Sequence, residues 1–430
     1  MTSTVAEFET IAERNELTSV AVIGMGYVGL PTALGLHESG VEVIGIDLSQ
    51  NRLDAIRSGE VDLIEADHRR LEKAVHQEDF RLTADSARMA EADAVLVCVP
   101  TGLDEYLMPD LGPLESACAA LVKHARPGQT LILTSTSYVG TSGRLLVKPL
   151  VAKGFKIGRD IFVASSPERI DPGNVTHTQQ ETPRVLGGVT PTCTAMAQRV
   201  INLLTPAVHC VSSAEAAELT KLYENTFRAV NIALANEFAE ISDGFAIDPI
   251  EVIDAAASKP YGFMAFHPGP GVGGHCIPCD PHYLLWQLRA TQHNAPLVTQ
   301  AMHAIAERPK QVVDRIAATL SRDGKGLGGT RVLVVGVTYK PGVQDVRSSS
   351  ALDIIDLLAA RGAKVGYHDP LVPTIRVTGG QLDSVAEPEA GDWDVALIHT
   401  VQPGHGYDWL GDVQLVIDAT YRFDPALFAN

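Results

Sequence analysis

Short apolar runs alternate with segments of helical periodicity along the first half of the chain. Residues 19–23 form a continuous run rich in Val and Ile, typical of a strand that is buried on both faces of a parallel sheet. A helix is predicted at 30–38, Gly40 ends it, and a second strand follows at 41–47. Further strands are expected at 94–99, 130–133, 161–164, 185–187 and 208–211, with a helix near 191–204. This alternation predicts an open, mainly parallel α/β sheet.

Helical periodicity replaces this alternation in the middle of the chain. The longest helical pattern spans about 213–244 and is rich in Ala and Leu. Further helices are expected at 249–257, 281–290 and 295–320. The central part is therefore predicted to be all-helical.

A second α/β series follows a glycine-rich break at 321–330. It combines a helix at 351–360 with strands at 331–336, 364–368, 395–398 and 415–417. The predicted domains are thus 1–211 and 326–430, each with a doubly wound sheet, joined by a central helical domain at 212–325.

Composition and charge limit the classes of function. The 430 residues carry a net charge of -18, which disfavours nucleic acid or an anionic membrane as the main partner. No apolar run approaches the roughly 20 residues that span a bilayer. Residues 2–16 are polar and acidic, unlike a signal peptide, and are expected to be a tail or a frayed helix. The six cysteines show no disulfide spacing, so a reducing cytoplasm is the expected location.

The first strand runs directly into a G-x-G-x-x-G sequence formed by Gly24, Gly26 and Gly29, with Tyr27 and Val28 inside it. With the helix that follows and Asp47 about 20 residues on, this is the fingerprint of a Rossmann-like dinucleotide site. Asp47 is expected to bind the adenosine ribose hydroxyls, which favours NAD. Arg52 is read either as a ligand of the ribose or phosphate or as a solvated helix residue.

Thr101 and Thr136 follow two further strands of the same sheet. Ligands bind where such strands end, so both are candidates for the cofactor side, although a Thr in this position is often only a helix cap. Glu168 and Arg169 follow the next strand and form either a surface salt bridge or part of the site.

The loop 268–281 contains four glycines within six positions and carries Cys276 and Asp280. Its glycines, among them Gly271, Gly273 and Gly274, are expected to leave backbone amides accessible to a ligand. We interpret Cys276 as a nucleophile that forms a covalent adduct with the substrate. The alternatives are an inert buried thiol, a redox pair with Cys279, and half of a zinc site.

Two further sets of polar residues are candidates for ligand binding. Lys221, Asn225 and Arg228 share one face of the long helix, as an exposed stripe or as the lining of a cleft. Lys340 and Arg347 lie in the first loop of the second α/β series, where they are either solvated or bound to a second phosphate-bearing ligand.

With these pieces in hand, the chain resembles the UDP-glucose/GDP-mannose dehydrogenase family. The matching motifs occur in family order: Gly24-x-Gly-Tyr-Val-Gly-Leu-Pro31, Ser166-Pro-Glu-Arg169, Lys221-x-x-x-Asn225, Gly273-Gly-His-Cys276-x-Pro-x-Asp280 and Tyr339-Lys-x-x-x-x-Asp-x-Arg347. Within the family the segment from Lys259 to Pro278 most resembles enzymes that act on UDP-N-acetylglucosamine, with UDP-N-acetylmannosamine enzymes as near rivals. Ile277 and Cys279 stand where UDP-glucose enzymes typically carry Phe and Lys, which weakens that third possibility.

The resemblance implies oxidation of a sugar C6 alcohol to a carboxylate with two NAD per turnover, in a homodimer formed through the central domain. It implies a thiohemiacetal and then a thioester on Cys276, with Asp280 as base and with Lys221 and Asn225 stabilising the oxyanion. The implied roles of the remaining residues fall into two groups. Glu168, supported by Thr136, would activate water for thioester hydrolysis, and substrate or phosphate contacts would come from Glu168, Arg169, Arg228, Lys340 and Arg347.

Three alternatives remain open at this point. The enzymes that act on N-acetylated sugars usually carry an aliphatic residue where this chain has Cys279. The second thiol leaves open a disulfide with Cys276 that would inhibit the enzyme. A non-catalytic NAD or nucleotide-sugar sensor would have no use for Cys276, Asp280, Lys221 and Asn225 together. A single-step hydroxyacid dehydrogenase would release one NADH per substrate, where the four-electron reaction releases two.

Overall fold

The structure is a computed structural model that describes residues 17–169 and 180–423. The chain divides into two compact units, Met1–Glu224 with His282–Gln287 and Asn225–Pro281 with Leu288–Asn430. The division falls inside the long helix α8 (Ala214–Gly244). The expectations for residues 2–16, and for the loop continuing from Arg169 through 170–174, lie outside the described residues. The three domain boundaries stay a prediction.

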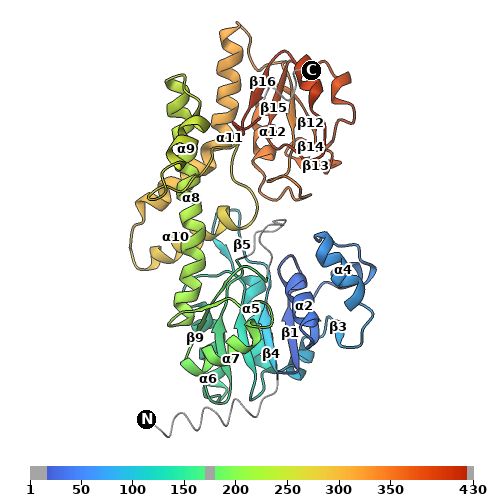
Figure 1. The fold of residues 1–430 in the computed structure, drawn as a ribbon, viewed down its shortest axis with the longest axis vertical. Helices are drawn as coiled ribbons and strands as arrows, with labels where there is room; N and C mark the ends of the chain where they lie inside the picture. Colours follow the sequence, from blue (N-terminus) through green and yellow to red (C-terminus); the bar gives the residue numbers. More distant parts are fainter. Residues whose placement is uncertain (1–16, 170–179, 424–430) are drawn as a thin grey trace. The chain divides into compact units, whose positions relative to one another are not determined.

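The first unit is built on an eight-stranded sheet with the order β10-β9-β8-β7-β4-β1-β2-β3. Figure 1 labels β1, β3, β4 and β9 of this sheet. Neighbouring strands are parallel except for the antiparallel pair β8 and β9. The strands are β1 (Ser19–Ile23), β2 (Glu42–Ile46), β3 (Phe80–Thr83), β4 (Ala94–Val97), β7 (Thr130–Leu133), β8 (Phe162–Ser165), β9 (Arg184–Gly188) and β10 (Val208–Cys210).

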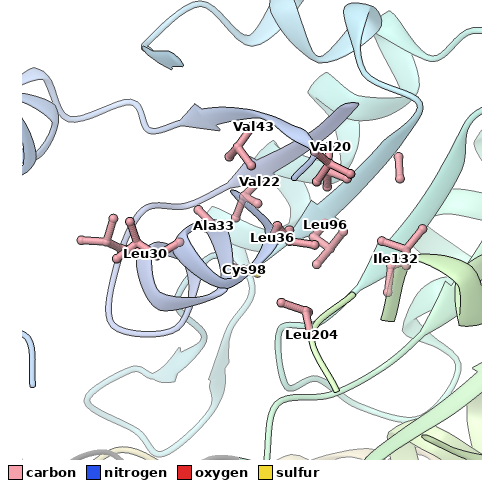
Figure 2. Packing of buried hydrophobic residues seen from close by; sticks show 14 of the residues in the cluster. Val20, Val22, Leu30, Ala33, Leu36, Val43, Leu96, Cys98, Ile132 and Leu204 are labelled. Carbon is pink, nitrogen blue, oxygen red and sulfur yellow. The ribbon is translucent and has the colours of Figure 1, made fainter. Parts of the chain in front are cut away.

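Helices cover both faces of this sheet. Val20 and Val22 of β1 pack with Leu30, Ala33 and Leu36 of α2 in one buried cluster, as Figure 2 shows. The helix α2 spans Gly29–Glu38. The same cluster includes residues of α3 (Gln50–Ser58), α4 (Glu65–Ala74) and α7 (Pro191–Ile201). Ala21 and Ile23 point to the opposite face, which α5 (Gly112–His124) and α6 (Lys148–Ala152) cover. The alternation along β1 therefore produces two apolar layers, as a doubly wound sheet requires.

The remaining elements of the first unit are short. A two-stranded hairpin joins β5 (Gly102–Leu103) and β6 (Pro109–Asp110). The 3-10 helix η1 (Ser86–Glu91) and the π-helical turn η2 (Gly143–Val147) complete it.

The helices after α8 are α9 (Pro249–Ala257), α10 (Cys276–Ala290) and α11 (Pro296–Arg322). The Asp248 side chain accepts a hydrogen bond from the Ile250 amide and so caps α9. The predicted start of α10 at 281 is wrong, because the helix begins at Cys276. Pro278 lies in the first turn, where the missing amide proton has no helical partner to lose, so it does not stop the helix.

The second unit contains a four-stranded, fully parallel sheet with the order β12-β11-β15-β16. These strands are β11 (Arg331–Val335), β12 (Lys364–His368), β15 (Val395–Ile398) and β16 (Val416–Asp418). One face packs on α11 and α12 (Ser350–Ala360), and the other on Tyr407 and on Leu410 of the 3-10 helix η4 (Asp408–Asp412). A hairpin, β13 (Thr374–Val377) with β14 (Gly380–Asp383), and the short η3 (Pro388–Ala390) complete this unit.

Both sheets reverse their strand order beside the first strand. In the first unit the chain passes from β1 outward to β2 and β3, then returns to place β4 on the other side of β1. In the second unit, β12 and β15 likewise flank β11 on opposite sides. Ligands of open parallel sheets bind at such switch points. The fold therefore presents one candidate ligand edge in each unit.

Candidate active site

The glycine turn after β1 fits a dinucleotide. A Cβ on Gly24, whose φ is +89°, would lie 2.8 Å from the Cys98 carbonyl oxygen, and one on Gly29 would lie 1.7 Å from the Gly24 oxygen. A Cβ on Gly26 would meet nothing within 4 Å. The outer glycines thus allow close packing within the protein, while the open side of Gly26 leaves room for a pyrophosphate. Tyr27 and Val28 follow, and Val28 immediately precedes α2.

Asp47, directly after β2, is tied to this turn. Its Oδ2 accepts a hydrogen bond of 2.9 Å from the Met25 amide, and its Oδ1 accepts one from the Ser49 amide. Each carboxylate oxygen can accept more than one hydrogen bond, so ribose hydroxyls can still donate to the half-buried side chain. Arg52 is half-buried and donates from Nε to the Met25 oxygen at 2.8 Å, so it supports the turn and is not a solvated helix residue.

The two threonines lie at the carboxyl ends of strands on the β4 side of β1. Thr101 follows β4 and is buried, and Thr136 follows β7 and is half-buried. Between these loops, the Ser135 hydroxyl donates to the Val99 oxygen at 2.7 Å. The hydrogen bond fixes the loop after β7 against the loop after β4.

Glu168 and Arg169 do not form the salt bridge with each other that the sequence left open. The Glu168 carboxylate pairs with Arg184 of β9 at 2.5 Å, and the Arg184 side chain is only 1% exposed. Arg169 instead binds Glu224 of α8 at 2.5 Å, while its amide donates to the Glu168 Oε1. Arg184 was missed because its partner is sixteen positions away and on a strand that reads as apolar. A cation in such a strand is the signal that could have found it.

The second unit brings two of the predicted catalytic residues into contact. The Asn225 Nδ2 of α8 donates to the Asp280 Oδ2 of α10 at 2.5 Å, and both side chains are at most 3% exposed. Cys276 is the first residue of α10, so Asp280 lies one turn further along the same face of that helix. A carboxylate thus lies beneath the thiol, at a helix N-terminus that favours negative charge.

The polar row of α8 is not uniform. Lys221 and Asn225, one turn apart, are 8% and 3% exposed, whereas Arg228 is exposed. The expected common environment of the three is therefore limited to Lys221 and Asn225. Lys221 and the Glu168 group belong to the first unit, whereas Cys276, Asn225 and Asp280 belong to the second.

The glycine loop before Cys276 is packed against the first loop of the second sheet. A Cβ on Gly273 would lie 2.5 Å from the Tyr339 Cβ, and one on Gly271 would lie 2.4 Å from the Ser350 Cβ. The Gly274 amide donates to the Arg347 carbonyl oxygen at 3.0 Å. The expectation that glycine leaves free amides here is therefore wrong for Gly274. These glycines allow two backbones to approach each other.

Two side chains hold the start of the same loop. The Asn236 Oδ1 accepts from the Gly269 amide at 2.9 Å, and the Arg308 Nε donates to the Gly269 oxygen at 2.9 Å. Arg308 is 3% exposed and also binds Glu240 at 2.9 Å. Both residues were missed, since their role depends on a partner more than thirty positions away.

A pocket of about 730 Å³ opens at the switch point of the second sheet. Its walls come from the loop before Cys276 and from the loops after β11, β15 and β16. The lining carries the cationic side chains of Lys340 and Arg422, and it includes His267, whose pKa is lowered by burial and by the Arg422 cation. Basic groups of this kind suit phosphates. Arg347, by contrast, is exposed and binds Asp345 at 2.6 Å.

His399, also in the lining, is buried and held on both sides. Its Nε2 lies 2.8 Å from the Ser350 Oγ, and its Nδ1 lies 2.8 Å from the Thr400 Oγ1. Burial lowers the pKa of His399 to about 3, so the ring is neutral. His399, Arg422 and Gln402 were missed, although the rule that ligands bind beyond the carboxyl ends of strands indicated their loops.

Metal binding and membrane insertion are two other possible functions. Within 17–169 and 180–423, no three side chains of His, Cys, Asp or Glu are grouped to hold a metal ion. No described helix is long and apolar enough to cross a membrane.

The fold and the site together define an oxidoreductase class, with a dinucleotide turn in one α/β unit, a phosphate-compatible pocket in the other, and a cysteine beside a buried Asn–Asp pair. Three family models match the chain in order. They describe the NAD-binding domain (residues 18–205), the central domain (215–305) and the UDP-binding domain (333–425) of the UDP-glucose/GDP-mannose dehydrogenase family.

Relatives of similar length agree with these models. The chain is 34% identical to an NDP-N-acetyl-D-galactosaminuronic acid dehydrogenase of Ralstonia nicotianae, with 86% of each chain covered. It is 34% identical to a UDP-N-acetyl-D-mannosamine dehydrogenase of Escherichia coli K12 (79% and 82% covered). It is 33% identical to a UDP-N-acetyl-D-glucosamine 6-dehydrogenase of Pseudomonas aeruginosa (82% and 83% covered). A UDP-D-ManNAc dehydrogenase structure from Pyrococcus horikoshii superposes with a TM-score of 0.86 at 28% identity, covering 95% of this chain and 96% of that one.

The chain therefore belongs to the UDP-glucose/GDP-mannose dehydrogenase family, and it is an NAD-dependent nucleotide-sugar dehydrogenase. The predicted architecture, two Rossmann-like α/β domains with a central helical domain, is confirmed, as are the family and the cofactor.

Proposed function

We propose that this enzyme oxidises C6 of a UDP-N-acetylhexosamine, UDP-N-acetylglucosamine in the first instance, to the uronic acid with two NAD. The observation that carries the proposal is the first turn of α10, where Cys276 stands one turn above Asp280 and Asp280 binds Asn225. A binding protein has no need for this combination of nucleophile and buried carboxylate. The relatives named above act, by their names, on N-acetylated sugars, which supports this substrate class over UDP-glucose.

The residues of the first unit fit the cofactor. Gly26 leaves the space for a pyrophosphate, Asp47 offers acceptors to the ribose, and Arg52 fixes the turn between them. NAD, when bound, would supply the acceptor for one hydride from C6, so the four-electron reaction uses two NAD in succession. Thr101 and Thr136 are proposed to complete the cofactor side, and Arg347 remains a proposed contact to the cofactor or UDP phosphates.

In the first half of the reaction a base must remove the proton of the C6 hydroxyl. Asp280, or a water that it holds with Lys221, is the proposed base. The Cys276 sulfur then adds to the aldehyde carbon and forms a thiohemiacetal, which retains the half-oxidised sugar. Lys221 and Asn225 are proposed to donate to the developing oxyanion. Loss of one such donor typically costs about 3 kcal/mol of barrier.

In the second half, C6 of the thiohemiacetal loses a second hydride and its hydroxyl loses a proton, which leaves a thioester. Water must then attack the thioester carbon, which forms the carboxylate and releases the Cys276 thiol. Glu168 is the proposed activator of this water, with support from Thr136, because its carboxylate is held by the ion pair with the buried Arg184. Arg169, Arg228 and Lys340 remain the proposed contacts to the sugar and the diphosphate.

The substrate is tested by supplying three UDP-sugars side by side and following NADH at 340 nm. We expect UDP-N-acetylglucosamine to give the highest kcat/KM and two NADH per sugar consumed. A preference for UDP-N-acetylmannosamine or UDP-glucose would change the sugar but keep the reaction. One NADH per sugar would contradict the four-electron reaction, and no NADH from any of them would favour a sensor.

The nucleophile is tested by Cys276→Ala, with Cys210→Ser as a matched control on an exposed cysteine outside the site. Cys276→Ala should keep its NAD affinity and lose acid formation by at least about a thousandfold, the order expected for removal of a covalent nucleophile. Cys210→Ser should behave as wild type. Substantial acid formation by Cys276→Ala would refute the covalent route.

We also propose that the partner in solution is a second copy of this chain. Leu234, Phe238 and Ile241 recur every three or four residues of α8, so they line one face, and each is between 43% and 49% exposed. A two-fold axis would cover the same face on both copies. Phe238→Glu should shift the mass measured by light scattering from dimer to monomer. A monomeric wild type would refute the dimer.

A further inference from the structure

The Cys-Ile-Pro-Cys segment at residues 276–279 holds two thiols whose relation the sequence left open. In the structure the two are not joined by a disulfide, and they occupy the first and fourth positions of α10. Residues three apart in a helix lie on the same face, with Cβ atoms about 5–6 Å apart. A disulfide needs Cβ atoms about 3.5–4.5 Å apart, so a small shift is enough to join them.

The position of Cys276 permits that shift. As the first residue of α10, it accepts no constraint from a preceding helical turn, and its side-chain direction depends on the loop before it. His275, which precedes it, contributes no side-chain hydrogen bond to the helix N-terminus. The pair can therefore close without breaking the hydrogen bonds that hold the body of α10.

The two thiols differ in environment, which sets the order of events. Cys276 is half-buried at the N-terminus of a 15-residue helix, where the helix dipole favours a thiolate. Cys279 is 9% exposed, and its pKa is raised to about 12 by burial first, and then by the Asp280 and Cys276 charges. Cys279 is thus a protonated thiol shielded from solvent, while Cys276 is the thiol that meets an oxidant. Oxidation of Cys276 also removes one of the charges that disfavour a Cys279 thiolate.

We propose that Cys276 and Cys279 form a reversible disulfide under oxidation by a peroxide, and that this modification protects the catalytic sulfur while it stops turnover. The inactivation, though not the disulfide itself, rests on the proposed role of Cys276 as nucleophile. The other four cysteines provide no such pair in sequence, and three of them are buried.

The chemistry balances with hydrogen peroxide as the two-electron oxidant. The Cys276 thiolate attacks one peroxide oxygen, the O–O bond breaks, and a sulfenic acid and hydroxide form. The Cys279 sulfur then attacks the Cys276 sulfur, the S–O bond breaks, and the proton of the Cys279 thiol leaves with the departing hydroxide as water. The second step is intramolecular, so it competes well with further oxidation of the sulfenic acid. A dithiol reductant reverses the sequence by thiol–disulfide exchange.

The test treats the reduced full-length enzyme with hydrogen peroxide and measures mass, linkage and activity together. We expect a loss of about 2 Da, a linked peptide that contains Cys276 and Cys279, and a parallel loss of activity that dithiothreitol restores. Cys279→Val replaces the resolving thiol by an aliphatic side chain of similar size. This variant should start with wild-type activity, gain about 32 Da at Cys276 as sulfinic acid, and recover little activity with dithiothreitol.

Cys210→Ser is the matched control, since it removes an exposed thiol and should leave the linkage and the recovery unchanged. Loss of activity without a linked peptide would overturn the proposal, as would equal recovery of Cys279→Val and wild type. Formation of the disulfide without loss of activity would leave the modification standing and would refute the proposed role of Cys276 as nucleophile. The two ideas therefore fail in distinguishable ways.

Discussion

The turn after β1 and the turn after β11 are built from matching parts. Each begins with a glycine in the left-handed region, Gly24 at φ +89° and Gly336 at φ +79°. In each, an aspartate after the neighbouring strand accepts from the next amide of the turn. The Met25 amide donates to Asp47 at 2.9 Å, and the Val337 amide donates to Asp369 at 2.8 Å. The amide two residues after each aspartate donates to its other oxygen at 2.9 Å.

The two turns diverge after this shared start. In the first unit α2 begins at Gly29, shortly after Gly24, and Asp47 remains half-buried. In the second unit the next helix, α12, begins only at Ser350. Asp369 is 2% exposed, and the Gln402 Nε2 covers it at 3.3 Å from the Asp369 Oδ2. The same acid is thus left open to a ligand in one unit and sealed in the other. What differs is the loop that follows each first strand, and the longer loop supplies Lys340 to the pocket.

The largest expected effect is a loss of stability when a side chain is added to Gly336, which packs against the protein. A side chain added to Gly26, which faces the ligand site, should instead weaken NAD binding. Gly336→Ala would place a Cβ 1.8 Å from the Thr400 oxygen at a positive φ, and we expect a loss of about 4 kcal/mol in unfolding free energy. Gly26→Ala meets no atom within 4 Å, so it should unfold as wild type but bind NAD at least about tenfold more weakly. Urea unfolding and NAD titration measure the two effects. If Gly336→Ala were as stable as the wild type, the second turn would not require the glycine with which both turns begin.

A smaller effect separates the two aspartates. Asp369→Asn turns an amide toward backbone donors in a buried site, and it should cost about 2 kcal/mol of stability while NAD affinity is unchanged. Asp47→Asn leaves the fold nearly intact, because its site is half-buried, and should weaken NAD binding by about tenfold. The same two assays apply to both variants. If Asp47→Asn destabilised the protein as much as Asp369→Asn and left NAD binding unaltered, Asp47 would be structural as well.

A third effect, which is expressed only at acid pH, concerns the residue after the strand on the other side of each turn, Cys98 after β4 and His399 after β15. Burial raises the pKa of Cys98 to about 12 and lowers that of His399 to about 3, so both are neutral at pH 7. A lowered histidine pKa means that the unfolded chain binds the proton first, so stability falls as the pH drops from about 6.5 toward 3. The expected loss is about 2 kcal/mol at pH 5.

His399→Gln should remove this acid sensitivity, since glutamine does not titrate, and Cys98→Ala should leave it in place. Trp393 and Trp409 both lie in the second unit, so their fluorescence follows its unfolding in urea at pH 7.5 and at pH 5. Equal acid sensitivity in His399→Gln and wild type would show that another group is responsible.

Features set by neighbours in the sequence were predicted best. The strand, glycine turn, helix and Asp47 of the first unit follow from adjacent residues, and the long helix α8 follows from its periodicity. The helix α4 was not predicted, because only three of its residues are buried and its first turn has no capping side chain. The first turn of α10 was missed because Pro278 reads as a helix breaker, so the predicted helix began only at 281.

The site was predicted as a set of residues but not as a set of contacts. Cys276 and Asp280 stood out in one loop, yet the hydrogen bond between Asn225 and Asp280 joins residues 55 positions apart. The pairing of Glu168 with Arg184 was equally out of reach, since Arg169, the next residue in sequence, offered a simpler partner. Contacts of this kind depend on the packing of whole elements, which local patterns do not encode.

The pocket of the second unit and the Cys276 sulfur are held by the same set of contacts. Gly269 and Gly271 line that pocket, and the same strand of backbone reaches Cys276 after being fastened by Asn236, Arg308 and the Gly274 amide. A nucleotide that binds in this pocket, as proposed, would therefore also position the segment that carries the Cys276 sulfur. A hexosamine without its nucleotide should react slowly even at saturating concentration. The contacts to the nucleotide, which help to position Cys276 for its attack on the sugar, would be missing.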